Sequence, residues 1–77
     1  MPAKDEGNTL KRFGINVRAR RAALDFSQET LAEKADLDRT YIGGIERGER
    51  NLTLLSAHRV AKALKTTVAE LCEGIDR

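Results

Sequence analysis

Few side chains in this 77-residue sequence could carry out covalent or metal chemistry. Histidine and cysteine each occur once, as His58 and Cys72, so the chain cannot supply a zinc-ligand set from these residues. Both are expected to pack rather than react. No G-x-x-x-x-G-K-[ST] phosphate loop is present, and helix capping and solubility explain the pair Asp36 and Asp38. The sequence therefore argues against an enzyme, and we expect no cofactor and no metal ion.

The stretch RTYIGGIERG, which follows Asp38, combines hydrogen-bonding side chains with residues that weaken a helix. Ile42 and Ile45 have the spacing of one helix face, and Asp38 is a suitable N-cap. Gly43 and Gly44 interrupt this helix, each at a cost of about 1 kcal/mol relative to alanine. Such glycines indicate either a close approach that a side chain would block or the relief of local crowding.

The length and composition predict one small domain with a modest core. A single cysteine excludes an internal disulfide and indicates a reducing compartment, so we expect a cytoplasmic protein. The apolar runs are too short for a membrane span or a signal peptide. Residues 1–8 are expected to form a short disordered lead, and residues 9–77 the folded domain.

Charge is distributed unevenly although the net charge is only +2. Residues 1–21 carry six basic and two acidic side chains, whereas residues 22–38 carry one basic and five acidic. This asymmetry indicates either two partners of opposite charge or a solvated face.

The hydrophobic periodicity predicts an all-α domain of five helices, because no stretch alternates like a strand. The first helix begins at Asn8 or Thr9 and places Leu10, Phe13, Val17 and Leu24 on one stripe. The second covers about 27–34, with Ser27 as its cap, and the third covers about 38–47, with Gly48 just beyond it.

Two shorter signals complete the domain. Thr53 can cap a fourth helix, whose inward stripe is Leu54, Ala57, Ala61 and Leu64. Residues 67–70 form a T-x-x-E capping box, which starts a short fifth helix that ends before residue 74.

The second and third helices match the helix-turn-helix pattern, although any small helical hairpin shares their short lengths and tight turn. The sequence motifs are more specific. Two segments resemble the family of phage lambda-type repressors: SQETLAEKADLDRTYIGGIERGERN and the downstream VAKALKTTVAEL. The resemblance extends from Leu10 to Leu71. Within that family the chain is most similar to controller proteins of restriction–modification systems. Antitoxins and small prophage repressors share many of the same sequence motifs, so they are the alternative assignments.

The resemblance implies a homodimeric transcription regulator, an activator or a repressor, that binds operators upstream of its own genes. The N-terminal end of the third helix would read bases through Arg39, Thr40 and Tyr41. Gly43 and Gly44 would face the DNA on the next turn. Controllers more often have a polar residue at 43, so no operator sequence can be transferred from them.

The resemblance also assigns contacts around the third helix. Four residues are expected to hold DNA phosphates: Gln28, Arg47, Arg50 and Asn51. Arg21 and Glu46 would form a structural ion pair between the first and third helices. Glu29 and Glu33 correspond to a patch that some repressors use to contact RNA polymerase, and the alternative is a solvated helix face.

Residues 52–77 are expected to form the dimerisation region. Its apolar candidates are Leu52, Leu55, Val68, Leu71 and Ile75. A two-fold dimer would place its recognition helices on a pseudo-palindromic site.

Overall fold

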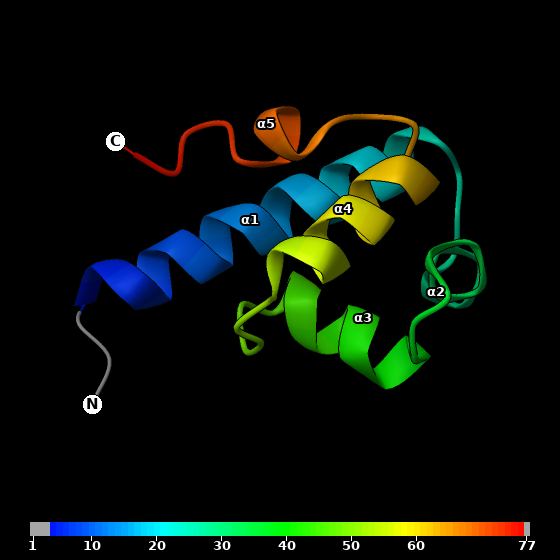
Figure 1. The fold of residues 1–77 in the computed structure, drawn as a ribbon, viewed down its shortest axis with the longest axis horizontal. Helices are drawn as coiled ribbons and strands as arrows, with labels where there is room; N and C mark the ends of the chain where they lie inside the picture. Colours follow the sequence, from blue (N-terminus) through cyan, green and yellow to red (C-terminus); the bar gives the residue numbers. More distant parts are fainter. Residues whose placement is uncertain (1–3, 77) are drawn as a thin grey trace.

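The structure, a computed structural model, describes residues 4–76 and forms five α-helices (Figure 1). No strand occurs in this part of the chain, so the predicted all-α fold is confirmed. None of these helices is long and apolar enough to cross a bilayer. The helices are α1 (Lys4–Ala23), α2 (Gln28–Ala35), α3 (Arg39–Glu46), α4 (Leu54–Ala63) and α5 (Val68–Leu71).

Helix α1 starts earlier than the sequence predicts. The chain is helical from Lys4, so neither Asn8 nor Thr9 caps this helix. Glu6 favours this extension, because negative charge stabilises the first turn of a helix. The remainder of the expected lead, residues 1–3, lies outside the described residues.

The other helix boundaries follow local capping chemistry. Each predicted cap side chain accepts a hydrogen bond from a backbone N–H two or three residues further on, and these caps are Ser27, Asp38, Thr53 and Thr67. Gly48 follows α3 with a φ of 74°, a left-handed conformation that glycine adopts without the steric cost of a side chain.

All five helices contribute to the core, and its largest fully buried side chains are Val17, Leu31, Ile42, Ile45, Val60 and Leu64. The predicted inward stripe of α4 is correct except at its first member. Leu54 is 77% exposed, because it occupies the first turn of α4, where the core no longer covers the helix.

Polar side chains on α1 attach the C-terminal helices to it. Arg20 donates from Nε to the carbonyl of Leu64 (2.9 Å) and from Nη2 to that of Lys65 (3.0 Å), where α4 ends. Asn16 donates from Nδ2 to the carbonyls of Leu71 (2.8 Å) and Glu73 (2.9 Å). These bonds satisfy carbonyls that the ends of α4 and α5 leave without helical partners.

Candidate nucleic-acid interface

Helices α2 and α3 form the predicted helix-turn-helix through a three-residue turn. Asp36 adopts a left-handed conformation with a φ of 56°, and the N–H of Leu37 donates to the carbonyl of Ala32 (2.9 Å). The partly buried Leu37 packs against the core. Asp36 also donates its N–H to the carbonyl of Glu33 (3.2 Å), so backbone hydrogen bonds and one apolar anchor fix the turn, and Asp38 caps α3 directly after it.

An ion pair braces the last turn of α3 against α1, as the resemblance implies. Arg21 contacts Glu46 in a bidentate manner, with Nε–Oε2 at 2.6 Å and Nη2–Oε1 at 3.0 Å. Arg21 also donates from Nη1 to the carbonyl of Phe26 (2.8 Å), and Gln28 donates from Nε2 to Oε1 of Glu46 (3.1 Å). One network thus joins α1, the segment before α2, α2 and α3.

The ion pair favours the charged form of Arg21. The hydrogen bond to Glu46 raises the pKa of Arg21 above its ordinary value, although burial acts in the opposite direction. The two side chains are only 17% and 4% exposed. Because both charges are largely withdrawn from water and fully paired, the network fixes the orientation of α3.

The N-terminal end of α3 is open to solvent. Arg39 and Thr40 are exposed, while Tyr41 is partly buried against the core. The guanidinium carbon of Arg50 lies 5.7 Å from the centre of the Tyr41 ring, which is within range of a cation–π interaction. The three side chains predicted to read bases therefore lie together at one end of a braced helix, and Arg50 is next to them.

The two glycines of α3 are covered, which differs from the expected open face. A Cβ at Gly43 would lie 3.1 Å from Nη1 of Arg47 and 3.6 Å from Oε1 of Gln28. A Cβ at Gly44 would lie 2.8 Å from Cγ of Arg50. The glycines thus provide space in which long polar side chains lie across the helix, and only movement of those side chains would uncover the backbone.

The expected phosphate contacts differ in how far they are already engaged. One amide hydrogen of Gln28 is used by Glu46, and the second stays available as a donor. Arg47 pairs with Glu49 at 3.0 Å, an exposed contact that is weak in water. Arg50 and Asn51 are exposed beyond the end of α3.

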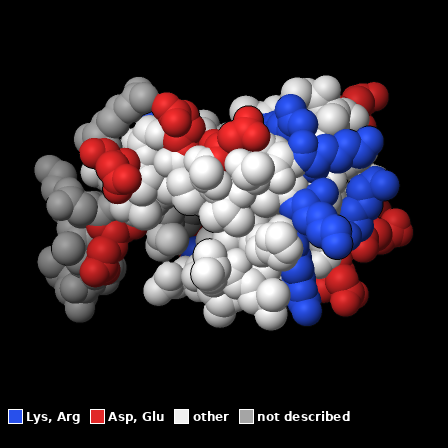
Figure 2. Space-filling view, turned by 45° about the horizontal axis from the view of Figure 1, so that its top comes forward, with Lys and Arg blue, Asp and Glu red and all other residues white. Residues whose placement is uncertain are grey.

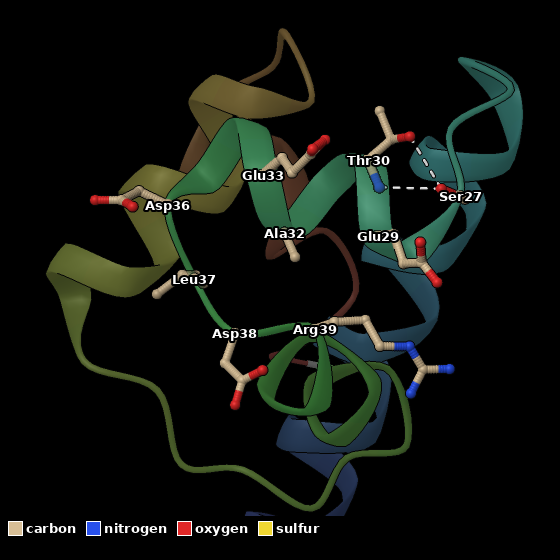
Figure 3. A pocket seen from close by; sticks show the side chains of 9 residues that line it. All are labelled: Ser27, Glu29, Thr30, Ala32, Glu33, Asp36, Leu37, Asp38 and Arg39. Carbon is tan, nitrogen blue, oxygen red and sulfur yellow. Dashed lines mark hydrogen bonds between the residues drawn. The ribbon is translucent and has the colours of Figure 1, made fainter.

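An acidic hollow adjoins the open end of α3 (Figure 3). Its carboxylates are those of Glu29, Glu33, Asp36 and Asp38, and Arg39 lines the same opening. Glu29 and Glu33 are exposed, so the residues expected to contact RNA polymerase are accessible beside the expected DNA-reading residues.

The residues expected at a dimer interface are not equivalent. Leu71 is 2% exposed within one protomer, which corrects the prediction for this residue: it belongs to the core. Three others are partly buried against that core: Leu52, Val68 and Ile75. Leu55 is 61% exposed, and its neighbour Leu54, which the sequence analysis placed inside, is exposed as well. The most exposed large apolar side chains therefore lie at the start of α4, and Ile15 on α1 is exposed as well.

Three structural residues of α1 were missed by the sequence analysis: Gly14, Asn16 and Arg20. Gly14 is buried where α1 meets the backbone of α3. Asn16 and Arg20 hold the ends of α5 and α4. Within residues 6–76 no group of three or more His, Cys, Asp or Glu side chains is arranged to hold a metal ion.

A braced helix with an open N-terminal end, joined by a tight turn to a supporting helix, defines a DNA-binding helix-turn-helix domain. The family model described as "Helix-turn-helix" matches residues 17–71, and the chain belongs to this family. Within the family it is similar to control proteins of restriction–modification systems, as the sequence predicts. Control protein C.MunI from Mycoplasma sp. is 38% identical over 71 residues, which cover 92% of this chain and 88% of that protein.

Solved structures give the same result. The restriction-modification controller protein C.AhdI from Aeromonas hydrophila has a TM-score of 0.79 and 47% identity, over 80% of this chain and 94% of that chain. The controller protein C.Esp1396I, solved as a tetramer in complex with its natural 35 base-pair operator, has a TM-score of 0.78 and 37% identity. That match covers 88% of this chain and 90% of the controller.

Proposed function

We propose that the protein is a cytoplasmic, homodimeric transcription regulator that binds operator DNA and controls restriction–modification genes, including its own. The observation that carries this proposal is the exposed N-terminal end of α3, held in place by the network around Glu46. No catalytic step is assigned to any residue.

In this proposal α3 enters the major groove, where each base pair presents a distinct pattern of donors and acceptors. Arg39 can bind O6 and N7 of guanine with two hydrogen bonds, and Thr40 offers a hydroxyl and a methyl group. Tyr41 is partly buried against the core, so packing restricts its ring before DNA binds. The Arg50 guanidinium lies over the Tyr41 ring, so both side chains can contact the DNA at the same place.

Contacts with the phosphates of the DNA backbone would set the position of α3 in the groove. Gln28 lies at the start of α2, where helix N–H groups favour a phosphate. Arg47, Arg50 and Asn51 follow α3 and can clamp the strand on the other side. Arg47 and Arg50 would leave the glycines that they cover, which would open Gly43 and Gly44 to the groove.

A two-fold dimer would place two recognition helices about 34 Å apart, one turn of DNA. We assign its interface to the start of α4 and the C-terminal segment. Leu54 and Leu55 are adjacent and 77% and 61% exposed, and such large apolar side chains are stabilised when a partner covers them. Leu52, Val68 and Ile75 contribute their partly exposed surfaces.

Leu55→Lys is expected to raise the dimer dissociation constant about 10-fold or more, since it places a charge against an apolar surface. Sedimentation velocity over a concentration series measures this shift. Ala22→Lys is the control, because it adds the same charge at an exposed apolar position at the end of α1. Equal effects of the two variants would remove Leu55 from the interface.

The acidic hollow supports a second partner at the promoter. Glu29 and Glu33 are exposed beside the DNA-reading end of α3, so a protein bound to adjacent DNA could reach them. We propose that RNA polymerase uses this surface when the regulator activates transcription.

Arg39→Ala is the test of base reading. On DNA from upstream of the protein's own gene, this variant is expected to lose about 1–3 kcal/mol of binding free energy while its salt dependence is unchanged. Arg47→Ala is the matched comparison: it should weaken binding to all sequences and reduce the salt slope by about 1. Gel-shift titrations over a salt series measure both quantities.

Two results would contradict the proposal. If the wild type showed no preference for its own upstream DNA, regulation of its own gene would be excluded. If Arg39→Ala weakened binding to specific and non-specific DNA equally, as Arg47→Ala should, then Arg39 would contact only the DNA backbone.

A further inference from the structure

The exposed ion pair between Arg47 and Glu49 lies among the proposed phosphate contacts, although it contributes little to stability. Between residues 39 and 53, Glu49 is the only exposed acidic residue, because Glu46 is used in the network with Arg21. Elsewhere on the surface, charge of one sign gathers, and Figure 2 shows Lys and Arg side chains together at one end of that face. A carboxylate in a DNA interface is repelled by phosphates, so the position of Glu49 points to a role other than binding DNA.

The backbone of Glu49 belongs to the C-terminal cap of α3. The N–H of Gly48 donates to the carbonyl of Ile45 (3.0 Å), and the N–H of Glu49 donates to that of Gly44 (2.9 Å). Because Gly48 has a φ of 74°, this arrangement is a Schellman motif, which ends many helices. The side chain of Glu49 therefore starts from a position that α3 determines.

Glu49 holds one edge of the Arg47 guanidinium, and another part of that group lies over the bare face of α3. Nε of Arg47 donates to Oε1 of Glu49 (3.0 Å), while Nη1 lies 3.1 Å from the position of a Cβ at Gly43. Oε1 of Gln28, another proposed phosphate contact, lies 3.6 Å from the same position. In the free protein, Arg47 thus lies against α3, where it covers Gly43 and binds a carboxylate instead of a phosphate.

We propose that Glu49 is a positioning residue that competes with DNA phosphates for Arg47, and that it lowers the affinity for every DNA sequence by a similar factor. A carboxylate and a phosphate bind the same N–H groups of a guanidinium. When Arg47 turns to the DNA backbone, it loses Glu49, and the freed carboxylate then faces phosphates of like charge. Both costs are independent of the bases, so Glu49 sets the strength of binding and leaves the sequence preference unchanged.

This inference rests on the proposed DNA-binding function and adds a residue that limits the affinity. A regulator of its own gene responds at the protein concentration at which its operator becomes occupied. Since Glu49 weakens binding, it raises that concentration.

The test is a double-mutant cycle in DNA binding. Glu49→Gln removes the charge and keeps the shape of the side chain, and it is expected to raise the affinity for both upstream DNA and non-operator DNA about 5-fold. In the Arg47→Ala background, the same change should alter the affinity less than about 2-fold, because no guanidinium is left to release. Fluorescence-anisotropy titrations at low ionic strength measure all four proteins, and the gain should shrink as salt rises.

Asp76→Asn is the control, since it removes the same charge from an exposed carboxylate of the C-terminal segment, which lies on the other side of α1 from α3 in Figure 1. It should change the affinity less than about 2-fold. An equal gain from the control, or an equal gain from Glu49→Gln with and without Arg47, would overturn the proposal, because net charge would then explain the effect. So would a Glu49→Gln variant that binds as the wild type does. A wild type that binds neither DNA would overturn the proposed function, and this inference with it.

Discussion

Glu46→Ala is expected to lower the free energy of unfolding by about 3–5 kcal/mol, because it leaves a largely buried Arg21 without its counter-charge. Arg21 and Glu46 are 17% and 4% exposed, so water cannot replace the lost carboxylate in place. The substitution removes two hydrogen bonds from Arg21 and one from Gln28. Urea denaturation followed by far-UV circular dichroism measures the change.

Glu49→Ala provides the matched control. Its carboxylate also pairs with an arginine, Arg47, at 3.0 Å, but the two side chains are 58% and 60% exposed. An exposed pair of this kind contributes about 0–1 kcal/mol, so the control should unfold nearly as the wild type does. A similar loss in both variants would show that burial and the shared network around Glu46 add nothing.

The network also explains why stability and DNA binding should fall together. Glu46 closes the last turn of α3, while Arg39 at its first turn is the proposed base reader. Gln28, a proposed phosphate contact, takes its orientation from the same carboxylate. Loss of Glu46 therefore affects both ends of the proposed DNA interface through the position of α3, without removing any proposed DNA contact.

Features that depend on neighbours in sequence could be predicted. Ser27, Asp38, Thr53 and Thr67 cap helices because a short polar side chain reaches the next backbone N–H groups, whatever the remainder of the chain does. The pairing of Arg21 with Glu46 came from family resemblance rather than from spacing. Its geometry, including the added contact of Gln28, required the packed structure.

Features that depend on packing were harder to predict. Periodicity places Leu54 and Leu71 on apolar faces, but it does not tell which face is covered within one protomer, and the two residues proved to have opposite environments. The cover over Gly43 and Gly44 depends on where Arg47 and Arg50 fold back. Sequence alone gives no such information, because long side chains have many rotamers.

The roles of the polar residues Asn16 and Arg20 also depend on packing and could not be predicted from the sequence. Their partners are carbonyls 44 to 57 residues further along the chain. On the sequence, Arg20 is one more basic residue of a basic helix, and a solvated position is its simplest interpretation. Only in the folded structure does Arg20 reach the end of α4 and donate hydrogen bonds to its last carbonyls.

Gly14→Ala is expected to lower the free energy of unfolding by about 1–3 kcal/mol, although alanine favours an isolated helix. A Cβ at Gly14 would overlap the carbonyl oxygen of Ile45 and lie 2.7 Å from that of Glu46. Backbone atoms cannot rotate away, so α1 and α3 would have to separate at the turn that Glu46 braces. Gly7→Ala is the control in the same helix: nothing lies within 4 Å of its Cβ, so it should gain up to about 1 kcal/mol. Urea denaturation of both variants decides the matter, because a gain in both would mean that α1 and α3 are not in close backbone contact at Gly14.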